Sequence, residues 1–275
     1  MPKPAQRVQT VRPKQAVFAA SIKQYPKRLV MITEGDSWFS YPLTANIADY
    51  IEMMNDFSIL RLEHNGDEAR EILGAGSEQL KKIKYYLKNY PVDAVLMSAG
   101  GNDLVAGELK NVLARRTNGA TWQSTVKLAV LTQVLDDIVG AFSRLLDARD
   151  ALRPKCVVFA HSYCYFEPNG RNATGPFGLL KAGPWMRPVL VSKGIDPATE
   201  GGAIAKYLVD ELHARLSALA TARPRFHVVD MRSALPADDT HWADEIHPSG
   251  TGFRKLAETC WRPALRAQFP GRGFE

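Results

Sequence analysis

Five short apolar runs alternate along this chain with longer stretches of amphipathic pattern. Short apolar runs bounded by turn residues are typical of buried strands, whereas apolar residues spaced three and four apart predict helices. Strands that alternate with helices pair in parallel through right-handed crossovers. The pattern therefore predicts an α/β fold with a doubly wound parallel sheet. Strands are predicted near 28–34, 57–63, 92–99, 155–161 and 225–230, and helices near 44–55, 67–89, 121–149 and 201–222, with a last helix from Ser249 through Phe253, Leu256 and Trp261.

A serine stands directly after the first predicted strand, in the segment Gly35-Asp36-Ser37. Ligands of open parallel sheets bind at the carboxyl ends of the strands, and a serine on a sharp turn there exposes its Oγ to the crevice. Ser37 is therefore a candidate nucleophile. The alternative is that Asp36 or Ser37 only caps the next helix, because both residue types accept hydrogen bonds from free N–H groups.

Two further segments carry the residues that a nucleophilic serine needs. The third predicted strand ends in two glycines followed by Asn102, and Asp244 precedes His247 by three residues near the carboxyl end. A serine needs a base to remove its proton, and a carboxylate on the other imidazole nitrogen fixes the tautomer of that base. We therefore predict that Ser37, Asp244 and His247 form one catalytic site.

These segments resemble the conserved blocks of the SGNH hydrolases, also called the GDSL esterase/lipase family. The resemblance spans about residues 28–265 and implies a flavodoxin-like five-stranded sheet in the order 2-1-3-4-5. It also implies that Ser37 is the nucleophile, that His247 and Asp244 are its partners, and that the oxyanion hole consists of Ser37, Gly66 and Asn102. The expected reaction is hydrolysis of a carboxylic ester through an acyl-enzyme, with no cofactor and no metal.

Two positions fit the family pattern less well. The family has leucine where this chain has Trp38, so the shape of the acyl pocket is expected to differ. Gly66 follows the second strand only in the segment His64-Asn65-Gly66-Asp67, and Gly74 or Gly76 is an alternative oxyanion donor.

The region 163–200 fits no predicted element and contains many prolines, glycines and aromatic residues. A long loop that leaves the carboxyl end of a strand lies over the crevice, and such loops are usually functional. We therefore predict a substrate-covering flap, and we expect substrate contacts from Trp38, Phe39, Phe177 and Trp185. The substrate is expected to be a small-molecule, lipid or saccharide ester; thioesters, aryl esters and O-acetylated sugars all remain open.

Three alternatives compete with this interpretation. His161 and His241 are rival bases, and Asp239 is a possible partner for His241. The segments containing Asp36 and Asp103, together with the histidines, also superficially suggest a metal-dependent phosphoesterase. The third alternative is a non-catalytic binding module of the same fold whose basic arm holds a polyanion.

The length and the distribution of charge indicate how the chain is divided into domains. Its 275 residues carry a net charge of +6, and residues 1–28 alone contain seven basic and no acidic residues, so the remainder is nearly neutral. We predict a possibly disordered basic arm over 1–28, one domain over 29–268 and a short tail over 269–275. A solvated tail is a commoner role for such an arm than binding to nucleic acid or a membrane, so no nucleic-acid partner is expected.

The chain shows no convincing secretion signal and no apolar run long enough to span a bilayer. Its three cysteines, Cys156, Cys164 and Cys260, have no metal-ligand spacing. A reduced cytoplasmic protein is therefore the simplest expectation, although export by another route stays open. The sequence does not indicate an oligomeric state.

Overall fold

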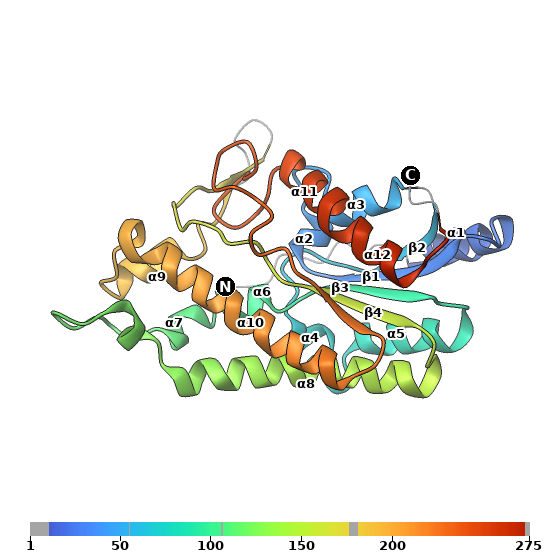
Figure 1. Ribbon diagram of the computed structural model, residues 1–275, viewed down its shortest axis with the longest axis horizontal. Coiled ribbons are helices and arrows are strands. Elements are labelled where there is room, and N and C mark those ends of the chain that lie inside the picture. Colours follow the sequence, from blue (N-terminus) through green and yellow to red (C-terminus); the bar gives the residue numbers. More distant parts are fainter. Residues whose placement is uncertain (1–10, 55, 106, 176–180, 273–275) are drawn as a thin grey trace.

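The fold is a five-stranded parallel sheet with helices on both faces, seen in a computed structural model that describes residues 11–54, 56–105, 107–175 and 181–272 (Figure 1). The strand order is β2-β1-β3-β4-β7, with every neighbouring pair parallel. This confirms the predicted fold class and strand order. The five strands are β1 Leu29–Gly35, β2 Phe57–Arg61, β3 Ala94–Ser98, β4 Val157–His161 and β7 Phe226–Val229.

The three central strands are buried along their whole length. Because helices cover both faces of such a sheet, its central strands carry almost continuous apolar runs rather than an alternating pattern. The register places Gly35 of β1 opposite Ser98 of β3. The ends of the first and third strands therefore lie side by side, where the strand order reverses and where such sheets bind ligands.

One face of the sheet is covered by helices α4, α5, α8 and α10, which pack against one another (Figure 1). The predicted helix over 67–89 is in fact two helices, because the chain turns at Gly76 with φ +82° and Ser77 caps the second helix by accepting from the N–H of Leu80. The bounds on this face are α4 Ala69–Ile72, α5 Glu78–Asn89, α8 Leu128–Leu152 and α10 Gly202–Ala222.

The opposite face is covered by α3, α11 and the segments that follow α11 (Figure 1). Ser249 caps α11 by accepting a hydrogen bond from the N–H of Gly252, and Phe253, Leu256 and Trp261 are fully buried, as predicted from their spacing. The bounds here are α2 Ser37–Ser40, α3 Ile47–Glu52, α11 Gly250–Leu256, the π-helical segment η4 Ala257–Trp261 and α12 Arg262–Gln268.

Part of the predicted basic arm is an ordered helix, α1 Val11–Gln24, which packs against β2 at the edge of the sheet. Phe18 is 2% exposed and contacts the rings of Tyr86 and Tyr90. This one aromatic anchor gives α1 an apolar contact that the charge pattern of the arm did not predict. Residues 1–10 lie outside the described residues.

The predicted flap also contains short elements rather than an irregular loop throughout. They are the strand pair β5 Ala173–Thr174 and β6 Lys181–Ala182, helix α9 Arg187–Ser192 and the π-helical segment η3 Pro197–Gly201. Three more short helical segments, α6 Gly101–Val105, α7 Leu109–Val112 and η1 Trp122–Thr125, follow β3. In the described part of the chain, no helix has both the length and the apolar composition needed to cross a membrane.

Candidate active site

Ser37 stands at the first position of helix α2, directly after the turn that ends β1. Gly35 has φ +134°, and a Cβ atom there would lie 2.0 Å from the carbonyl oxygen of Ser98, so only glycine allows β1 and β3 to approach this closely. Asp36 caps α2 by accepting a hydrogen bond from the N–H of Trp38 at 3.0 Å. The capping alternative thus holds for Asp36, and the cap fixes the turn that presents Ser37.

The structure brings Ser37, His247 and Asp244 together as predicted from the sequence. The distance from Ser37 Oγ to His247 Nε2 is 2.7 Å, and His247 Nδ1 lies 2.9 Å from each carboxylate oxygen of Asp244. All three residues are buried. Burial alone would raise the pKa of Asp244, but hydrogen bonds and the charge of His247 outweigh it and hold that pKa below its usual value.

Asp244 is also fixed by its own surroundings. Its Oδ1 accepts hydrogen bonds from the N–H groups of Ile246 and His247, both at 2.9 Å, and its Oδ2 accepts one from the Tyr41 hydroxyl at 2.7 Å. The backbone bonds follow from the three-residue spacing, because the aspartate closes its own turn. The bond from Tyr41 was not predicted, since nothing in its sequence position indicates it.

Two aromatic rings hold the His247 imidazole. The ring of Tyr41 stacks on it with centroids 4.6 Å apart, and Trp185 meets it edge-on at 4.9 Å. Trp185 is positioned by Glu245, whose buried carboxylate accepts hydrogen bonds from the backbone N–H groups of residues 185–187. Glu245 lies within the Asp-x-x-His motif, so these hydrogen bonds connect the segment that carries Trp185 to that motif. In the sequence, the only signal for this role was an acidic residue between Asp244 and His247.

Asn102 lies beside Ser37, and Gly66 lies on the loop after β2 that Asn102 contacts. Asn102 Nδ2 donates to the carbonyl oxygen of Asp67 at 3.0 Å, which joins α6 to the loop after β2. Gly66 precedes that carbonyl and has φ +88°, with no atom within 4 Å of an added Cβ. The bond places Asp67, the residue after Gly66, beside Asn102, whereas Gly74 and Gly76 lie beyond α4. It also shows that Asn102 bonds a neighbouring segment rather than closing its own turn.

The loop after β2 has a second anchor in Asp103. This buried carboxylate accepts hydrogen bonds from the N–H groups of Ala69 and Arg70 at 2.7 and 3.2 Å, and from Nε of Arg70 at 3.0 Å. Asp103 is thus occupied with the start of α4. This placement removes it from the set of carboxylates that suggested a two-metal phosphoesterase site.

A buried polar network lies behind the serine turn. Asp36 accepts hydrogen bonds from the Ser98 hydroxyl at 2.6 Å and from the Tyr163 hydroxyl, in addition to its cap on Trp38. His161 Nε2 lies 2.9 Å from Ser98 Oγ, so the network extends to β4. Burial raises the pKa of Asp36 to about 6, although these hydrogen bonds oppose the increase.

We expect Asp36 to reduce stability as the pH rises from about 4 to about 6. An unfolded aspartate has a pKa of ~3.9, so in this window the folded protein keeps a proton that the unfolded chain has lost, and the free energy of unfolding falls with pH. A difference of ~2 pKa units corresponds to ~3 kcal/mol. Asp36→Asn removes this titration. The free energy of unfolding of the variant, relative to that of the parent, should therefore be higher at pH 7 than at pH 4.

Denaturant unfolding of both proteins between pH 4 and 7 measures this difference. Asp136→Asn, at an exposed aspartate on α8, is the control and should leave the pH dependence of the parent unchanged. The same pH dependence in Asp36→Asn and the parent would contradict the assignment.

The rival histidines have other partners. Both ring nitrogens of His161 lie 2.9 Å from hydrogen-bonding partners, Ser98 Oγ and the Ser162 carbonyl, and burial lowers the pKa of His161 to about 4. His241 Nδ1 lies 2.7 Å from Asp238 rather than Asp239. His241 thus has the same Asp-x-x-His spacing as His247, so spacing alone does not distinguish them. The hydrogen bond to Ser37 does.

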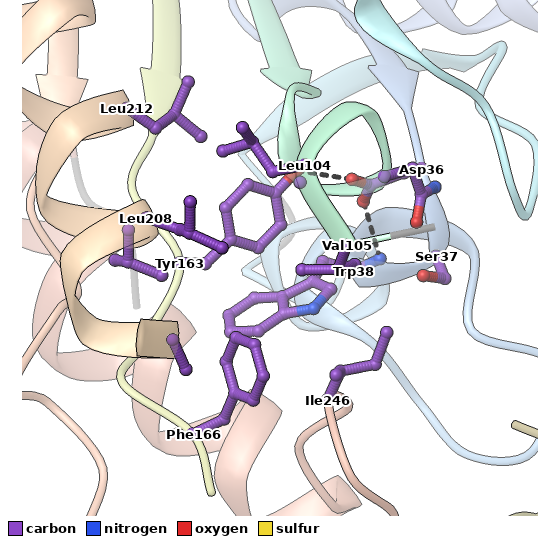
Figure 2. A pocket seen from close by; sticks show the side chains of 14 residues that line it. Asp36, Ser37, Trp38, Leu104, Val105, Tyr163, Phe166, Leu208, Leu212 and Ile246 are labelled. Atoms are coloured by element: carbon purple, nitrogen blue, oxygen red, sulfur yellow. Dashed lines mark hydrogen bonds between the residues drawn. The ribbon is translucent and has the colours of Figure 1, made fainter. Parts of the chain in front are cut away.

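An apolar pocket opens beside Ser37 and Asn102, with about 490 Å³ of empty space that includes part of the open solvent. Figure 2 shows Ser37 at one end of its lining and Leu208 and Leu212 of α10 at the other. An apolar lining favours apolar groups. The remaining lining comes mainly from α6, the segment after β4 and α10, and includes Leu104, Val105, Tyr163, Phe166, Val209 and Ile246.

The four expected substrate contacts have different positions. Trp38 lines the pocket, and Trp185 lies against His247 instead. Phe39 is fully buried between the rings of His161 and Trp261, so it belongs to the core and not to the pocket lining. Consecutive helical residues face different directions, which is why Trp38 and Phe39 separate. Phe177 lies outside the described residues.

Comparisons with known proteins show the fold. No family model matches the sequence, and no protein of curated function matches it. Among solved structures, a lipase from a goat rumen metagenome matches with a TM-score of 0.56 and 17% identity, over 90% of this chain and 100% of its own. A family 3 carbohydrate esterase from Clostridium thermocellum matches with a TM-score of 0.52 and 15% identity, over 90% and 100% of the two chains.

A protein described as a GDSL-like lipase, from Bacteroides ovatus, matches with a TM-score of 0.51 and 11% identity, over 89% of this chain and 54% of its own. Identities this low show a shared architecture only. The chain therefore has the fold of the SGNH hydrolases, as its sequence motifs predicted.

Proposed function

We propose that this protein is a serine esterase that transfers the acyl group of a carboxylic ester to water. The observation that carries the proposal is the contact of Ser37 Oγ with His247 Nε2 at 2.7 Å, with Asp244 on the other ring nitrogen, beside an apolar pocket. This is the arrangement of nucleophile, base and orienting carboxylate that acyl transfer needs. The esterases and lipases among the structures of the same fold support this assignment.

In the proposed mechanism, Ser37 Oγ attacks the ester carbonyl carbon while His247 Nε2 takes the hydroxyl proton. The carbonyl oxygen becomes an oxyanion that accepts hydrogen bonds from Asn102 Nδ2 and from the backbone N–H groups of Ser37 and Gly66. The intermediate collapses, the bond to the leaving alcohol breaks, and that alcohol takes the proton from His247. Water then attacks the acyl-enzyme in the same way, with His247 as its base, and releases the acid and free Ser37.

Asn102→Ala tests the oxyanion hole. We expect a loss of about 3 kcal/mol in transition-state stabilisation, or roughly a hundredfold or more in kcat, with little change in KM, because the amide meets a charge that exists only in the transition state. Turnover should be measured per titrated active site, together with the melting temperature, because Asn102 also bonds the loop at Asp67.

Asn111→Ala, at an exposed asparagine on α7, is the matched control and should keep parental turnover. If Asn102→Ala loses stability but its folded fraction turns over at the parental rate, Asn102 is structural and the oxyanion assignment is wrong.

We propose that the apolar pocket binds the acyl group, which favours esters of apolar acids over acetylated sugars. Leu208 is 1% exposed and faces the pocket from α10. A tryptophan at this position should fill space that a longer acyl chain needs, and the cost in such pockets is about tenfold or more in kcat/KM. Leu208→Trp should therefore lose activity on p-nitrophenyl octanoate and retain it on p-nitrophenyl acetate.

Leu128→Trp, at an exposed leucine that starts α8, is the control and should leave the ranking of substrates unchanged. An acetylated saccharide belongs in the same panel. Equal losses on acetate and octanoate, or a parental preference for the acetylated saccharide over every p-nitrophenyl ester, would contradict the acyl-pocket assignment.

A further inference from the structure

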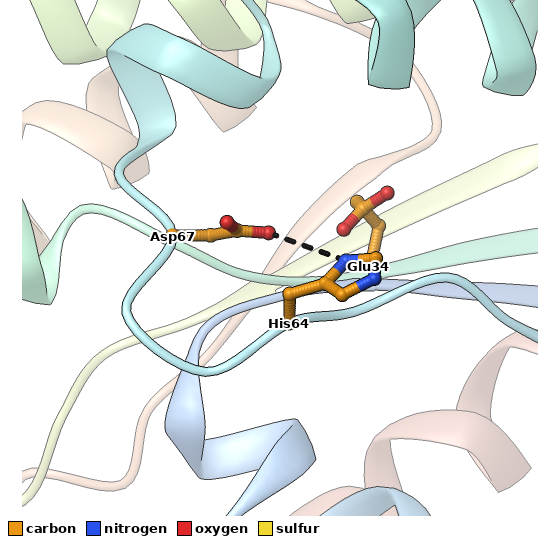
Figure 3. A group of neighbouring side chains, drawn as sticks. All are labelled: Glu34, His64 and Asp67. Carbon is orange, nitrogen blue, oxygen red and sulfur yellow. Dashed lines mark ion pairs between the residues drawn. The ribbon is translucent and has the colours of Figure 1, made fainter. Parts of the chain in front are cut away.

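Three side chains that the proposed mechanism does not use converge at the loop after β2. Glu34 lies in β1, two residues before Asp36, and His64 and Asp67 lie on either side of Gly66 in the loop (Figure 3). One ligand atom from each, a carboxylate oxygen or an imidazole nitrogen, lies within 4.8 Å of the other two. Within the described residues, this is the group of histidine, cysteine and acidic side chains placed closely enough to share a metal ion.

Glu34 is the unusual member of this group. It is fully buried, its Oε1 accepts a hydrogen bond from the N–H of Gly35 at 2.9 Å, and its Oε2 has no hydrogen-bond partner among the described residues. Its neighbour Glu63, by contrast, accepts hydrogen bonds from Thr33 and Arg61. A buried carboxylate oxygen without a partner is costly, so it indicates a ligand that the protein chain itself does not supply.

The charges around Glu34 point the same way. The acidic side chains of Asp67 and Glu63 lie near it, and Lys82 is the basic side chain that opposes their charge. No hydrogen bond or ion pair joins Lys82 to Glu34 in the described part of the chain. Two carboxylates held close together, one fully buried and the other partly buried, are stabilised either by a proton or by a cation.

We propose that Glu34, His64 and Asp67 bind a divalent first-row metal ion of the zinc or manganese type. One imidazole nitrogen and two carboxylate oxygens suit such ions, whereas calcium takes oxygen ligands alone. Three protein ligands leave further positions for water. The site is separate from Ser37 and His247 and supplies no step of ester hydrolysis.

The ligands can close to bonding distance by side-chain rotation. Ligand atoms on a tetrahedral zinc ion, with bonds of about 2.1 Å, lie about 3.4 Å apart, so the present separations, which are within 4.8 Å, need to shorten by up to about 1.4 Å. His64 Nδ1 and Asp67 Oδ2 are 3.8 Å apart, and the His64 side chain is 53% exposed and can move. The backbone is already fixed, because the N–H of His64 bonds the carbonyl of Gly35.

A cation at this site would hold the loop that carries the proposed oxyanion donor. His64 and Asp67 bracket Gly66, and the carbonyl of Asp67 accepts the hydrogen bond from Asn102. A cation bound by His64, Asp67 and Glu34 would fix this loop against β1. The metal site would thus stabilise the loop beside the catalytic crevice.

Isothermal titration calorimetry of chelator-treated full-length protein with ZnCl₂ and MnCl₂ tests the proposal without any ester substrate. We expect one equivalent of metal to bind the parent, with CaCl₂ binding more weakly, and the melting temperature to rise with bound metal. Glu34→Gln and His64→Ala should each weaken binding by roughly tenfold or more. Because His64 is exposed, its variant should fold even if Glu34→Gln does not.

His213→Ala is the matched control, since His213 Nε2 also lies 3.8 Å from an aspartate, Asp230. It should bind metal as tightly as the parent. The proposal is overturned if the parent binds neither ion, if His64→Ala binds as tightly as the parent, or if His213→Ala loses as much affinity as His64→Ala. Ester turnover plays no part in these outcomes, so they stand apart from the test of the proposed esterase.

Discussion

Ser37→Ala should lower the turnover of any accepted ester by about 10⁴-fold or more while the protein stays folded. Removing the nucleophile of a triad removes the covalent pathway, and the remaining rate comes only from the oxyanion hole and from substrate binding. Ser37 Oγ makes its contact with His247, so an alanine loses one hydrogen bond and creates almost no cavity. Initial rates on p-nitrophenyl esters and the melting temperature measure both parts of this expectation.

Ser40→Ala is the matched control for this experiment. Ser40 lies in the same short helix and is bonded to the carbonyl of Asp36 at 3.2 Å, outside the contact with His247. It should retain activity close to that of the parent. Near-parental turnover by a folded, uncontaminated Ser37→Ala preparation would show that another group is the nucleophile.

His247→Ala should be nearly as damaging as Ser37→Ala, because the serine then has no base. Asp244→Asn should cost about 10⁴-fold or less, since it disturbs the tautomer and charge of His247 but leaves the base in place. Tyr41, which donates to Asp244 Oδ2, can still donate to the amide oxygen in that variant. The readout is kcat/KM of each variant on the same ester.

His241→Ala is a sharp control, because His241 and Asp238 repeat the spacing of His247 and Asp244 on the same segment. It should keep most of the parental activity. If His241→Ala is inactive and His247→Ala is active, the base assignment passes to His241.

The five strands and the residues Ser37, Asp244 and His247 could be predicted from the sequence, because local signals mark each of them; that Ser37 and His247 meet across 210 positions was implied by the resemblance to the SGNH hydrolases. The apolar runs identified all five strands, and the turn residues after β1 and β3 identified the edge where the site lies. The Asp-x-x-His spacing predicted a carboxylate on the imidazole, since that pair closes a single turn. Each of these signals lies within a few consecutive residues.

The rest depends on contacts between distant segments. Tyr41 stacks on His247 from more than two hundred positions away, and Glu245 holds the backbone of residues 185–187. Phe39 was expected to contact substrate, but it is buried against Trp261. The helix α1 forms on a basic arm because Phe18 finds aromatic partners on α5. The spacing of residues along the sequence does not predict contacts of this kind.

Labelling with a fluorophosphonate followed by peptide mapping shows directly whether Ser37 is a nucleophile activated by His247. This reagent reacts with an activated serine without needing the natural ester. We expect one label per chain, on Ser37, in the parent and in Ser40→Ala, and no label in Ser37→Ala or His247→Ala. Folded parental protein that takes up no label, or that carries it on a residue other than Ser37, would contradict the assignment of Ser37 as the activated nucleophile.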